Sequence, residues 1–421
     1  MECDAGRRRV LGGHAVVLAA LVPWLVFPHV VPESGRVLLI GCGALVALGY
    51  GACLIWLQDR PTGWAVAGLA ALAVVSWWTH DRTLADTQHH FGGFAAGILV
   101  CGVCAATAVG ERESLAAGVV FAAGTVAILG VGLASVSVNT GKFVGVLREI
   151  PVAVTDWLPN YQLPLPGLED GAVNANALGG VVLMVLPTVW AVFRSLPRGG
   201  WWTWGGAIAL TATLMGVLVL LVTRSRTALA VVFVVGLCGL VWKIRHSIPA
   251  VVAVVVAMGA LAVYGANYGG EFGLVTDSAR TRGVIWAAAM DRLTERPMSG
   301  IGINQFRDVP ASEDSGVPPT VPHAHNTFIQ VALDLGIPGV LAYILVMGRL
   351  VVLSRCRGAV PLSVERLAMG AGLSLVAVHL FGMADAISLG AKVGMFVWLN
   401  AGLILAVHGR QTNVWKRGPH A

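Results

Sequence analysis

The residues best suited to chemistry form a histidine pair near the end of a long polar stretch, His323-Ala324-His325-Asn326. Imidazole exchanges protons near neutral pH, so His325 is a candidate general base. An HxH pair also resembles a set of metal ligands, although no third ligand lies nearby in the sequence. The structural alternative is a histidine that packs at a membrane interface. We take His325 as the catalytic candidate, with His323 and Asn326 in support.

Two arginine pairs are candidates for binding an anionic group. Arg224 and Arg226 lie in the short connection 223–226, between two apolar runs, and Arg280 and Arg282 lie in a later polar segment. Guanidinium groups stay charged and bind phosphate oxygens in a bidentate manner, so these pairs are suited to a lipid diphosphate. The alternative is that they are interfacial arginines with extended side chains, or part of a solvated helix face.

Three further side chains are weaker candidates. Trp286 follows the second arginine pair by one helical turn and is suited to anchor a helix at the lipid headgroups. Asn176 begins one apolar run, and Asp385 follows another. Ionisable residues in or beside a membrane span are functional candidates by default, but each polar residue here could also cap or fix a helix end.

The elements that must position these residues are apolar. The chain has 421 residues, of which 56% are hydrophobic and 12% charged, whereas soluble domains carry about 25% charged residues. A membrane-spanning helix needs roughly 20 apolar residues. We therefore predict an all-α integral membrane protein with about 12 transmembrane helices. The candidate spans are 13–31, 36–57, 63–78, 91–109, 115–135, 177–194, 203–222, 226–242, 248–266, 338–353, 366–383 and 389–407.

The basic residues give these spans a direction. With the N-terminus in the cytoplasm, nearly every short inside loop carries Lys or Arg, as the positive-inside rule requires. We expect nine spans in residues 1–266, an outer loop at 267–337 that carries the active site, and three spans with a cytoplasmic tail at 338–421. The net charge of +6 is explained by this arrangement and does not indicate nucleic-acid binding. The seven cysteines lie mostly in apolar runs, so no disulfide framework is expected.

Two amphipathic or short helices are expected in the outer loop. Apolar residues at helical spacing predict a helix over 279–296 that lies on or near the outer membrane face. Residues 327–335 can form a second helix, which Gly336 and Pro338 break before the next span. The Gly-x-Gly between the two helices, at 300–302, predicts a tight turn rather than a phosphate site.

At these residues the sequence resembles the O-antigen ligase family of bacterial inner membranes. Three elements agree in order and spacing: Ser-Arg at the outer end of a span (225–226), then Arg, Trp, Pro and Gly-x-Gly in the outer loop (282–302), and finally His-Asn, nine residues and Gly-x-x-Gly from His325 to Gly339. The last element is the most specific. The resemblance covers roughly residues 170 to 400, and Asp334 stands where the family often has Glu.

The resemblance implies a fold like that of GT-C membrane glycosyltransferases. It implies an O-antigen ligase that moves a glycan from undecaprenyl diphosphate to a sugar hydroxyl of lipid A–core at the periplasmic face, without metal or other cofactor. In this interpretation Arg226 and Arg282 bind the donor diphosphate, with Arg224 and Arg280 as second choices. His325 takes the acceptor proton, and attack opposite the diphosphate inverts the anomeric centre. The expected partners are the donor, the acceptor and membrane lipids, but no nucleic acid.

Two other functions stay open. An O-antigen or polysaccharide polymerase would use another lipid-linked repeat unit as acceptor, and such polymerases more often divide the work between two large basic loops. Here loop 136–176 holds only Lys142 and Arg148, against five arginines in 267–325. A transporter of lipid-linked sugars would place ionisable residues near mid-bilayer in several spans, whereas here they gather at one face.

Overall fold

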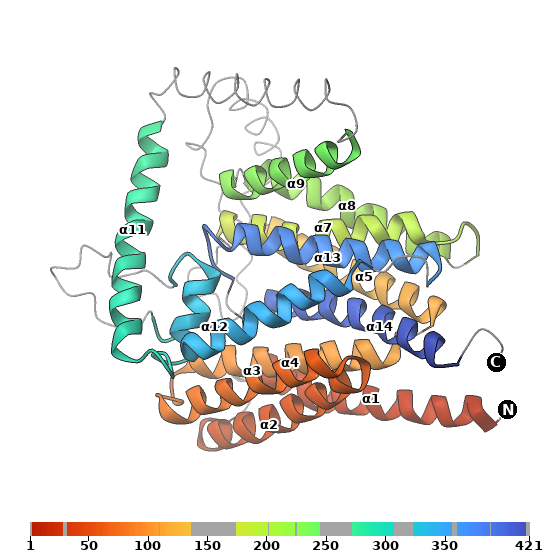
Figure 1. Cartoon of the computed structure of the whole chain (residues 1–421), viewed down its shortest axis with the longest axis horizontal. Coiled ribbons are helices and arrows are strands. Elements are labelled where there is room, and N and C mark those ends of the chain that lie inside the picture. Colours follow the sequence, from red (N-terminus) through yellow and green to blue (C-terminus); the bar gives the residue numbers. More distant parts are fainter. Residues whose placement is uncertain are drawn as a thin grey trace.

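The computed structural model describes residues 2–27, 32–108, 110–135, 174–200, 202–223, 225–244, 272–306, 323–355, 360–387 and 389–417, and these residues form helices without any strand (Figure 1). The elements are α1 (Glu2–Val26), α2 (Glu33–Gln58), α3 (Arg60–Thr79), α4 (Ala85–Thr107), α5 (Glu111–Ser135), α7 (Ala175–Ser195), α8 (Trp202–Thr223), α9 (Arg226–Ile244), α11 (Phe272–Glu295), α12 (Thr327–Leu353), α13 (Leu362–Phe381), the 3₁₀ turn η6 (Lys392–Gly394) and α14 (Met395–Arg417).

Nine of the described helices are long and apolar enough to cross a membrane, and α1 and α9 contain shorter apolar segments. Every predicted span overlaps a described helix except 248–266, which lies outside the described residues. The chain is therefore a multi-pass helical membrane protein. The total of about 12 spans and the GT-C-like fold stay predictions.

The spans differ in how deeply they are buried in the protein. In the most apolar window of α4, 72% of the residues are buried, against 39% in α8. Glycines allow α2 to lie against α4: a Cβ atom on Gly51 would be 2.6 Å from the carbonyl oxygen of Ile98, and one on Gly102 would be 2.5 Å from that of Gly51. Small residues thus bring these backbones into contact, as expected for packed membrane helices.

A charged cluster ties three helices together at the end of the bundle where α2 turns into α3. Asp59 lies in that turn, and Arg349 of α12 donates to its carboxylate from Nε at 2.6 Å and from Nη2 at 2.8 Å. Thr62 donates its backbone N–H to the same group at 3.1 Å, and Nε2 of His408 on α14 lies 3.6 Å away. This cluster fixes the relative positions of α3, α12 and α14.

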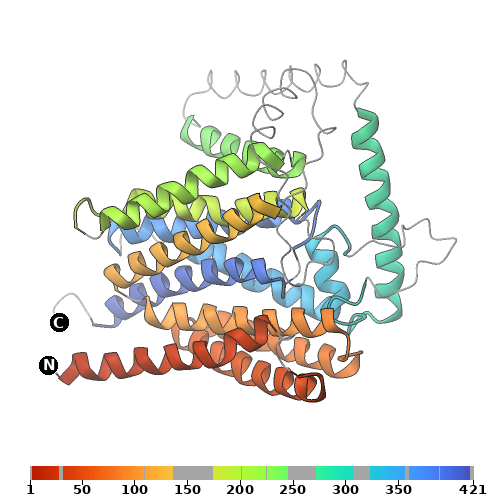
Figure 2. The same cartoon turned by 180° about the vertical axis from the view of Figure 1, so that it is seen from behind.

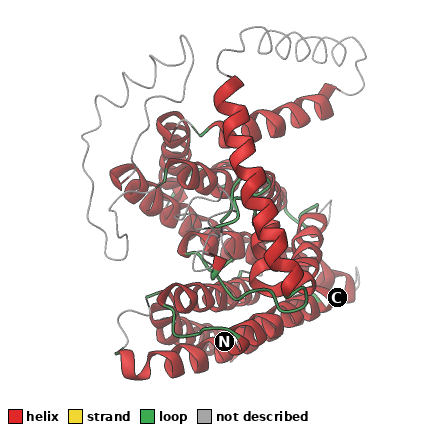
Figure 3. Ribbon diagram, turned by 90° about the vertical axis from the view of Figure 1, so that its left-hand side faces the viewer, coloured by secondary structure: helices red, strands yellow, loops and turns green. Residues whose placement is uncertain are grey.

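Helix α11 is oriented differently from the spans. Figures 1 and 2 show the spans lying roughly side by side, with α11 running across their ends, and Figure 3 views the bundle from the side of α11. The expected amphipathic helix is present, but it begins at Phe272 rather than near residue 279. Asp277 and Ser278 are residue types that favour helix starts, but they lie inside the helix, because such residues are also tolerated within helices.

Candidate active site

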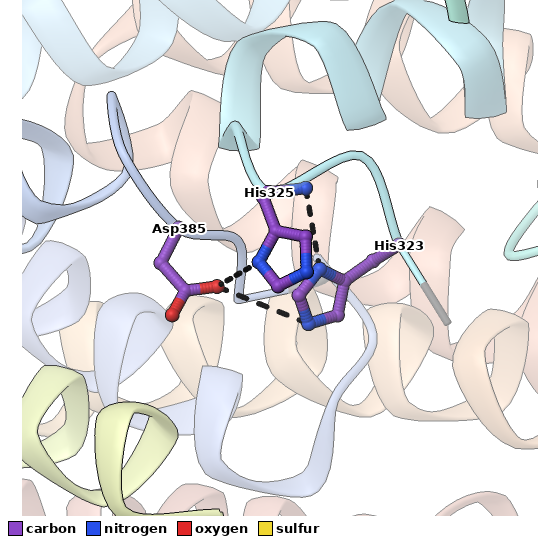
Figure 4. A group of neighbouring side chains, drawn as sticks. All are labelled: His323, His325 and Asp385. Carbon is purple, nitrogen blue, oxygen red and sulfur yellow. Dashed lines mark hydrogen bonds and ion pairs between the residues drawn. The ribbon is translucent and has the colours of Figure 1, made fainter. Parts of the chain in front are cut away.

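Three side chains meet at the end of the bundle that α11 crosses. His323 and His325 precede α12, and Asp385 lies in the loop after α13 (Figure 4). Nδ1 of His325 lies 3.1 Å from Oδ1 of Asp385, and Nε2 of His323 lies 3.9 Å from the same oxygen. The imidazole rings contact each other edge to face, with centroids 4.4 Å apart. The two histidine side chains are 24% and 29% exposed, so a substrate can reach them, whereas that of Asp385 is only 8% exposed.

The contacts define where the histidine protons lie. The backbone N–H of His325 donates to Nδ1 of His323 at 3.3 Å, so this Nδ1 accepts and the ring proton of neutral His323 is on Nε2, facing Asp385. The carboxylate of Asp385 accepts the Nδ1–H of His325 in the same way. Nε2 of His325 is then left with a free lone pair. This is the arrangement that a general base requires.

The electrostatics of Asp385 favour its charged form. Burial would raise the pKa of this carboxyl group, but the hydrogen bond from His325, the charges of both histidines and the backbone N–H of Ala386 together lower the pKa below its usual value. Asp385 therefore stays anionic at neutral pH and can stabilise a protonated imidazole beside it.

The start of α12 fixes the position of His325. Asn326 caps this helix, because its Oδ1 accepts from the backbone N–H groups of Phe328 at 2.9 Å and Ile329 at 3.2 Å. Its Nδ2 donates to the carbonyl of Met383 at 3.1 Å, and the N–H of Thr327 donates to that of Gly382 at 2.7 Å. The end of α13 is thereby bound to the start of α12, which brings Asp385 to His325.

A buried polar chain supports the histidine segment from within α12. The N–H of Ala324 donates to Oε1 of Gln330 at 3.0 Å, and Nε2 of Gln330 donates to Oδ1 of Asp334 at 2.8 Å. The same oxygen of Asp334 accepts from the backbone N–H of Asn304 at 3.0 Å. His325 itself has a φ of 48°, a conformation that is uncommon outside glycine and that these contacts on either side maintain.

The two glycine motifs pack directly on each other. Gly300 (φ 69°) and Gly336 (φ 74°) both have left-handed backbones, and Gly336 produces the kink inside α12. The N–H of Ile301 donates to the carbonyl of Leu333 at 2.7 Å, and that of Ile337 donates to Pro297 at 2.8 Å. These contacts agree with a structural role for the Gly-x-Gly turn and with the predicted break of the helix at Gly336.

The N-terminal spans also hold this loop, which the sequence did not reveal. Ser76 of α3 donates to the carbonyl of Asp334 at 2.6 Å, and Thr87 of α4 donates to that of Ile303 at 3.0 Å. Nε2 of Gln305 donates to the carbonyl of Asp81, between these two helices, at 2.8 Å. Isolated Ser and Thr residues in apolar runs carry no pattern that would identify these partners in advance.

The comparisons with known proteins can be set against this geometry. Residues 210–344 match the O-antigen ligase family. The match confirms the resemblance predicted from the motifs, and it supports a ligase- or polymerase-type glycosyltransferase that acts on lipid-linked glycans. It runs from α8 into α12 and includes His325, whereas Asp385 lies beyond it. A comparison with curated proteins found no match.

Within this O-antigen ligase region, the structure places one arginine of the first pair. Arg226 is exposed at the first residue of α9, directly after Ser225, whose Oγ accepts from the N–H of Ala228 at 3.3 Å. Gly179 of α7 packs on Ser225. Arg224 lies outside the described residues.

The starts of α7 and α9 also meet the end of α13. Leu178, Ala228 and Phe381 belong to one buried cluster. Arg226 is the first residue of α9 and Asp385 lies just after α13, so both adjoin elements that pack together. Asn176 is half-buried in the first turn of α7, and its backbone N–H donates to Oδ1 of Asn174, which caps that helix, at 2.8 Å.

The second arginine pair of the O-antigen ligase region lies on α11. Arg280 is exposed and Arg282 half-buried, one turn before Trp286. Among the described residues, neither arginine forms an ion pair. Trp286 packs in a cluster with Ala324, next to the histidines, and its buried Nε1 has no hydrogen-bond partner within the described part of the chain. Helix α11 is therefore docked beside His325.

The same three side chains could hold a metal ion. One ligand atom from each of His323, His325 and Asp385 lies within 4.8 Å of the others. Two histidines and one carboxylate are a known ligand set for zinc. No third ligand lies near the histidines in the sequence, and Asp385, 60 residues after His325, provides the third ligand atom in the structure. Metal-free function stays a prediction.

Proposed function

We propose that this protein is an O-antigen ligase that transfers a glycan from undecaprenyl diphosphate to a sugar hydroxyl of lipid A–core at the periplasmic face of a bacterial inner membrane. The observation that carries the proposal is the hydrogen bond from Nδ1 of His325 to Asp385, at the start of a helix that matches the O-antigen ligase family. This contact leaves Nε2 of a partly exposed imidazole available to accept a proton.

In the proposed reaction, the acceptor hydroxyl attacks the anomeric carbon of the donor glycan as Nε2 of His325 takes the hydroxyl proton. A new C–O bond forms, the bond between the anomeric carbon and the diphosphate oxygen breaks, and the undecaprenyl diphosphate leaves with the electron pair. Attack from the opposite side inverts the anomeric centre. Asp385 stabilises the imidazolium that results, and a metal ion is not needed for these steps.

The leaving diphosphate requires positive charge and hydrogen-bond donors. Arg226 and Arg282 are proposed to supply the charge, with Arg224 and Arg280 as second choices. Trp286 is proposed to support the site by anchoring α11 beside the histidines. His323 and Asn326 are proposed to orient the catalytic pair, and Asn176, in the first turn of α7, is a further supporting candidate.

A reconstituted transfer assay tests the function. Purified protein is mixed with an undecaprenyl-diphosphate glycan and rough lipopolysaccharide. The products are separated by size and by the lipid to which the glycan is attached, either lipid A–core or the undecaprenyl carrier. We expect the glycan on lipid A–core. Growth of the glycan on the undecaprenyl carrier would instead establish a polymerase, the alternative that shares the family match. Movement of the donor across the bilayer without any new glycosidic bond would establish a transporter.

A further inference from the structure

A second candidate site lies at the other ends of the helices that form the active site. Helices α7, α12 and α13 line an open cavity of about 500 Å³, the basic groove. Its charged residues are Arg194 in the last turn of α7, Arg355 just after α12, and Arg366 in the first turns of α13. The catalytic candidates lie at the start of α12 and after α13. Arg366 lies 15 residues before Phe381, the last residue of α13, so at a rise of about 1.5 Å per residue it is about 20 Å from the end of α13 that leads to Asp385.

The cavity is polar at one end and apolar along its walls. Trp190, Val351 and Leu373 contribute to the walls. Trp190 is 48% exposed and Leu373 42% exposed on the outside of spanning helices, so the cavity is open toward lipid. Helices α7 and α13 approach closely at Gly370, where a Cβ atom would be 2.4 Å from that of Ala191 and 2.8 Å from the carbonyl oxygen of Pro187. The groove is therefore formed by packed backbone.

The charged residues that line the cavity are all arginines, while the carboxylates of Glu111 and Glu365 lie at the same end of the bundle outside the lining. No ion pair of Arg194, Arg355 or Arg366 is formed within the part of the chain that the structure describes, and the one side-chain hydrogen bond found for the three is from Nη1 of Arg366 to the carbonyl of Arg194 at 3.1 Å. The positive-inside rule accounts for basic residues in these connections, but it does not require their side chains to line one cavity. Here three arginines from different elements converge on one cavity.

We propose that this groove binds an anionic phospholipid of the leaflet opposite to the active site. The phosphate would lie between the three guanidinium groups, which bind phosphate oxygens well, and an acyl chain would lie along Trp190, Val351 and Leu373. Basic pockets between membrane helices on the positive-inside face are suited to such headgroups. The inference does not depend on the reaction at His325.

Native mass spectrometry of the full-length protein, purified in mild detergent with phosphatidylglycerol and phosphatidylethanolamine, tests this site. We expect retention of phosphatidylglycerol by the natural sequence, and loss of retention by about tenfold or more when Arg194, Arg355 and Arg366 are all replaced by Gln. The matched control replaces Arg60, Arg112 and Arg198, which lie at the same end of the bundle but do not line the cavity. It should retain the lipid.

A further variant separates a lipid from a free anion. Leu373→Trp leaves the three arginines intact but fills the apolar part of the groove, so it should also release phosphatidylglycerol. Equal retention of the two phospholipids, or equal loss in the groove and control triple variants, would overturn the proposal. Undiminished binding in Leu373→Trp together with displacement by inorganic phosphate would do the same, because it would show a simple anion site.

Discussion

In the proposed reaction, proton transfer depends on which ring nitrogen of His325 carries hydrogen. Asp385 accepts at Nδ1, so Nε2 is the basic nitrogen. His325 and Asp385 were both candidates from the sequence, but their pairing was not predictable, because 60 residues and the span α13 separate them. The contact becomes visible only once the start of α12 is bound to the end of α13.

Replacement of Asp385 by Asn tests its positioning role. An amide is neutral and can also donate, so it no longer selects the tautomer or stabilises the imidazolium. We expect kcat to fall by about 10²–10⁴-fold with little change in KM.

The control for this variant is Asp81→Asn. Asp81 is exposed, lies outside the histidine cluster, and accepts a hydrogen bond from the backbone N–H of Thr83. It should keep nearly normal transfer. If Asp385→Asn transfers glycan at the wild-type rate, Asp385 does not act through His325.

Chelation distinguishes the hydrogen-bonded pair from a metal site built of the same side chains. If His325 acts as a base held by Asp385, then EDTA should leave the transfer rate within about twofold of its starting value, and purified protein should contain no stoichiometric zinc. A rate that collapses on chelation and returns with one added divalent metal would assign His323, His325 and Asp385 as ligands instead.

At the scale of elements, the contact between the loop after α11 and the kink in α12 depends on two glycines. A Cβ atom on Gly300 would lie 2.2 Å from the carbonyl oxygen of Leu333, and one on Gly336 would lie 2.3 Å from that of Met298. Both residues also have positive φ. The sequence predicted a turn and a helix break at these positions, but it could not show that the two pack on each other.

We therefore expect Gly300→Ala and Gly336→Ala to destabilise the protein by at least about 1–3 kcal/mol, because each combines backbone strain with a clash. Thermal unfolding in detergent measures the change. The matched control is Gly283→Ala on α11, where a new Cβ would meet no atom within 4 Å. That substitution should be neutral or stabilising by about 0.5–1 kcal/mol. Equal melting temperatures for all three variants would contradict this account.

At the scale of the whole molecule, the active-site end and the charged cluster at Asp59 lie at opposite ends of α12. Burial would raise the pKa of Asp59, but hydrogen bonds from Arg349 and Thr62 lower it to about 2. Because the folded pKa is below the ordinary value of 3.8 for an aspartate, the stabilisation is fully present above about pH 4 and is lost as the pH falls toward 2.

Asp59→Asn should lower stability by about 1–3 kcal/mol, a value reduced from that of a fully buried pair because the Arg349 side chain is 38% exposed. Melting temperatures of the variant and the natural sequence should differ by a constant amount between about pH 7.5 and pH 9, where neither a carboxylate nor a histidine changes its charge. Arg60→Gln, which removes an exposed arginine that lies over the Trp56 ring, is the control and should change little. If the difference in melting temperature disappears within that pH range, the stabilisation does not come from the ionised carboxylate of Asp59.

Hydropathy predicted most of this architecture, since every predicted span that falls on described residues overlaps a helix. The apolar pattern fixes where helices lie along the chain but not which neighbours they meet. The hydrogen bonds from Ser76 and Thr87 to the active-site loop illustrate this limit, because 216 or more residues separate each partner pair. The groove between α7, α12 and α13 is likewise formed only by their packing.

The central claim is that Nε2 of His325 takes the acceptor proton during glycan transfer, and the rate of transfer by His325→Gln tests it most directly. The variant is compared with His14→Gln, which alters a histidine bound to Tyr50 on α1 and α2, away from the cluster. With donor and lipid A–core both saturating, we predict that His325→Gln forms the product about 10²–10⁴-fold more slowly, while His14→Gln stays close to the natural rate. Transfer by folded His325→Gln at an undiminished rate would contradict the account.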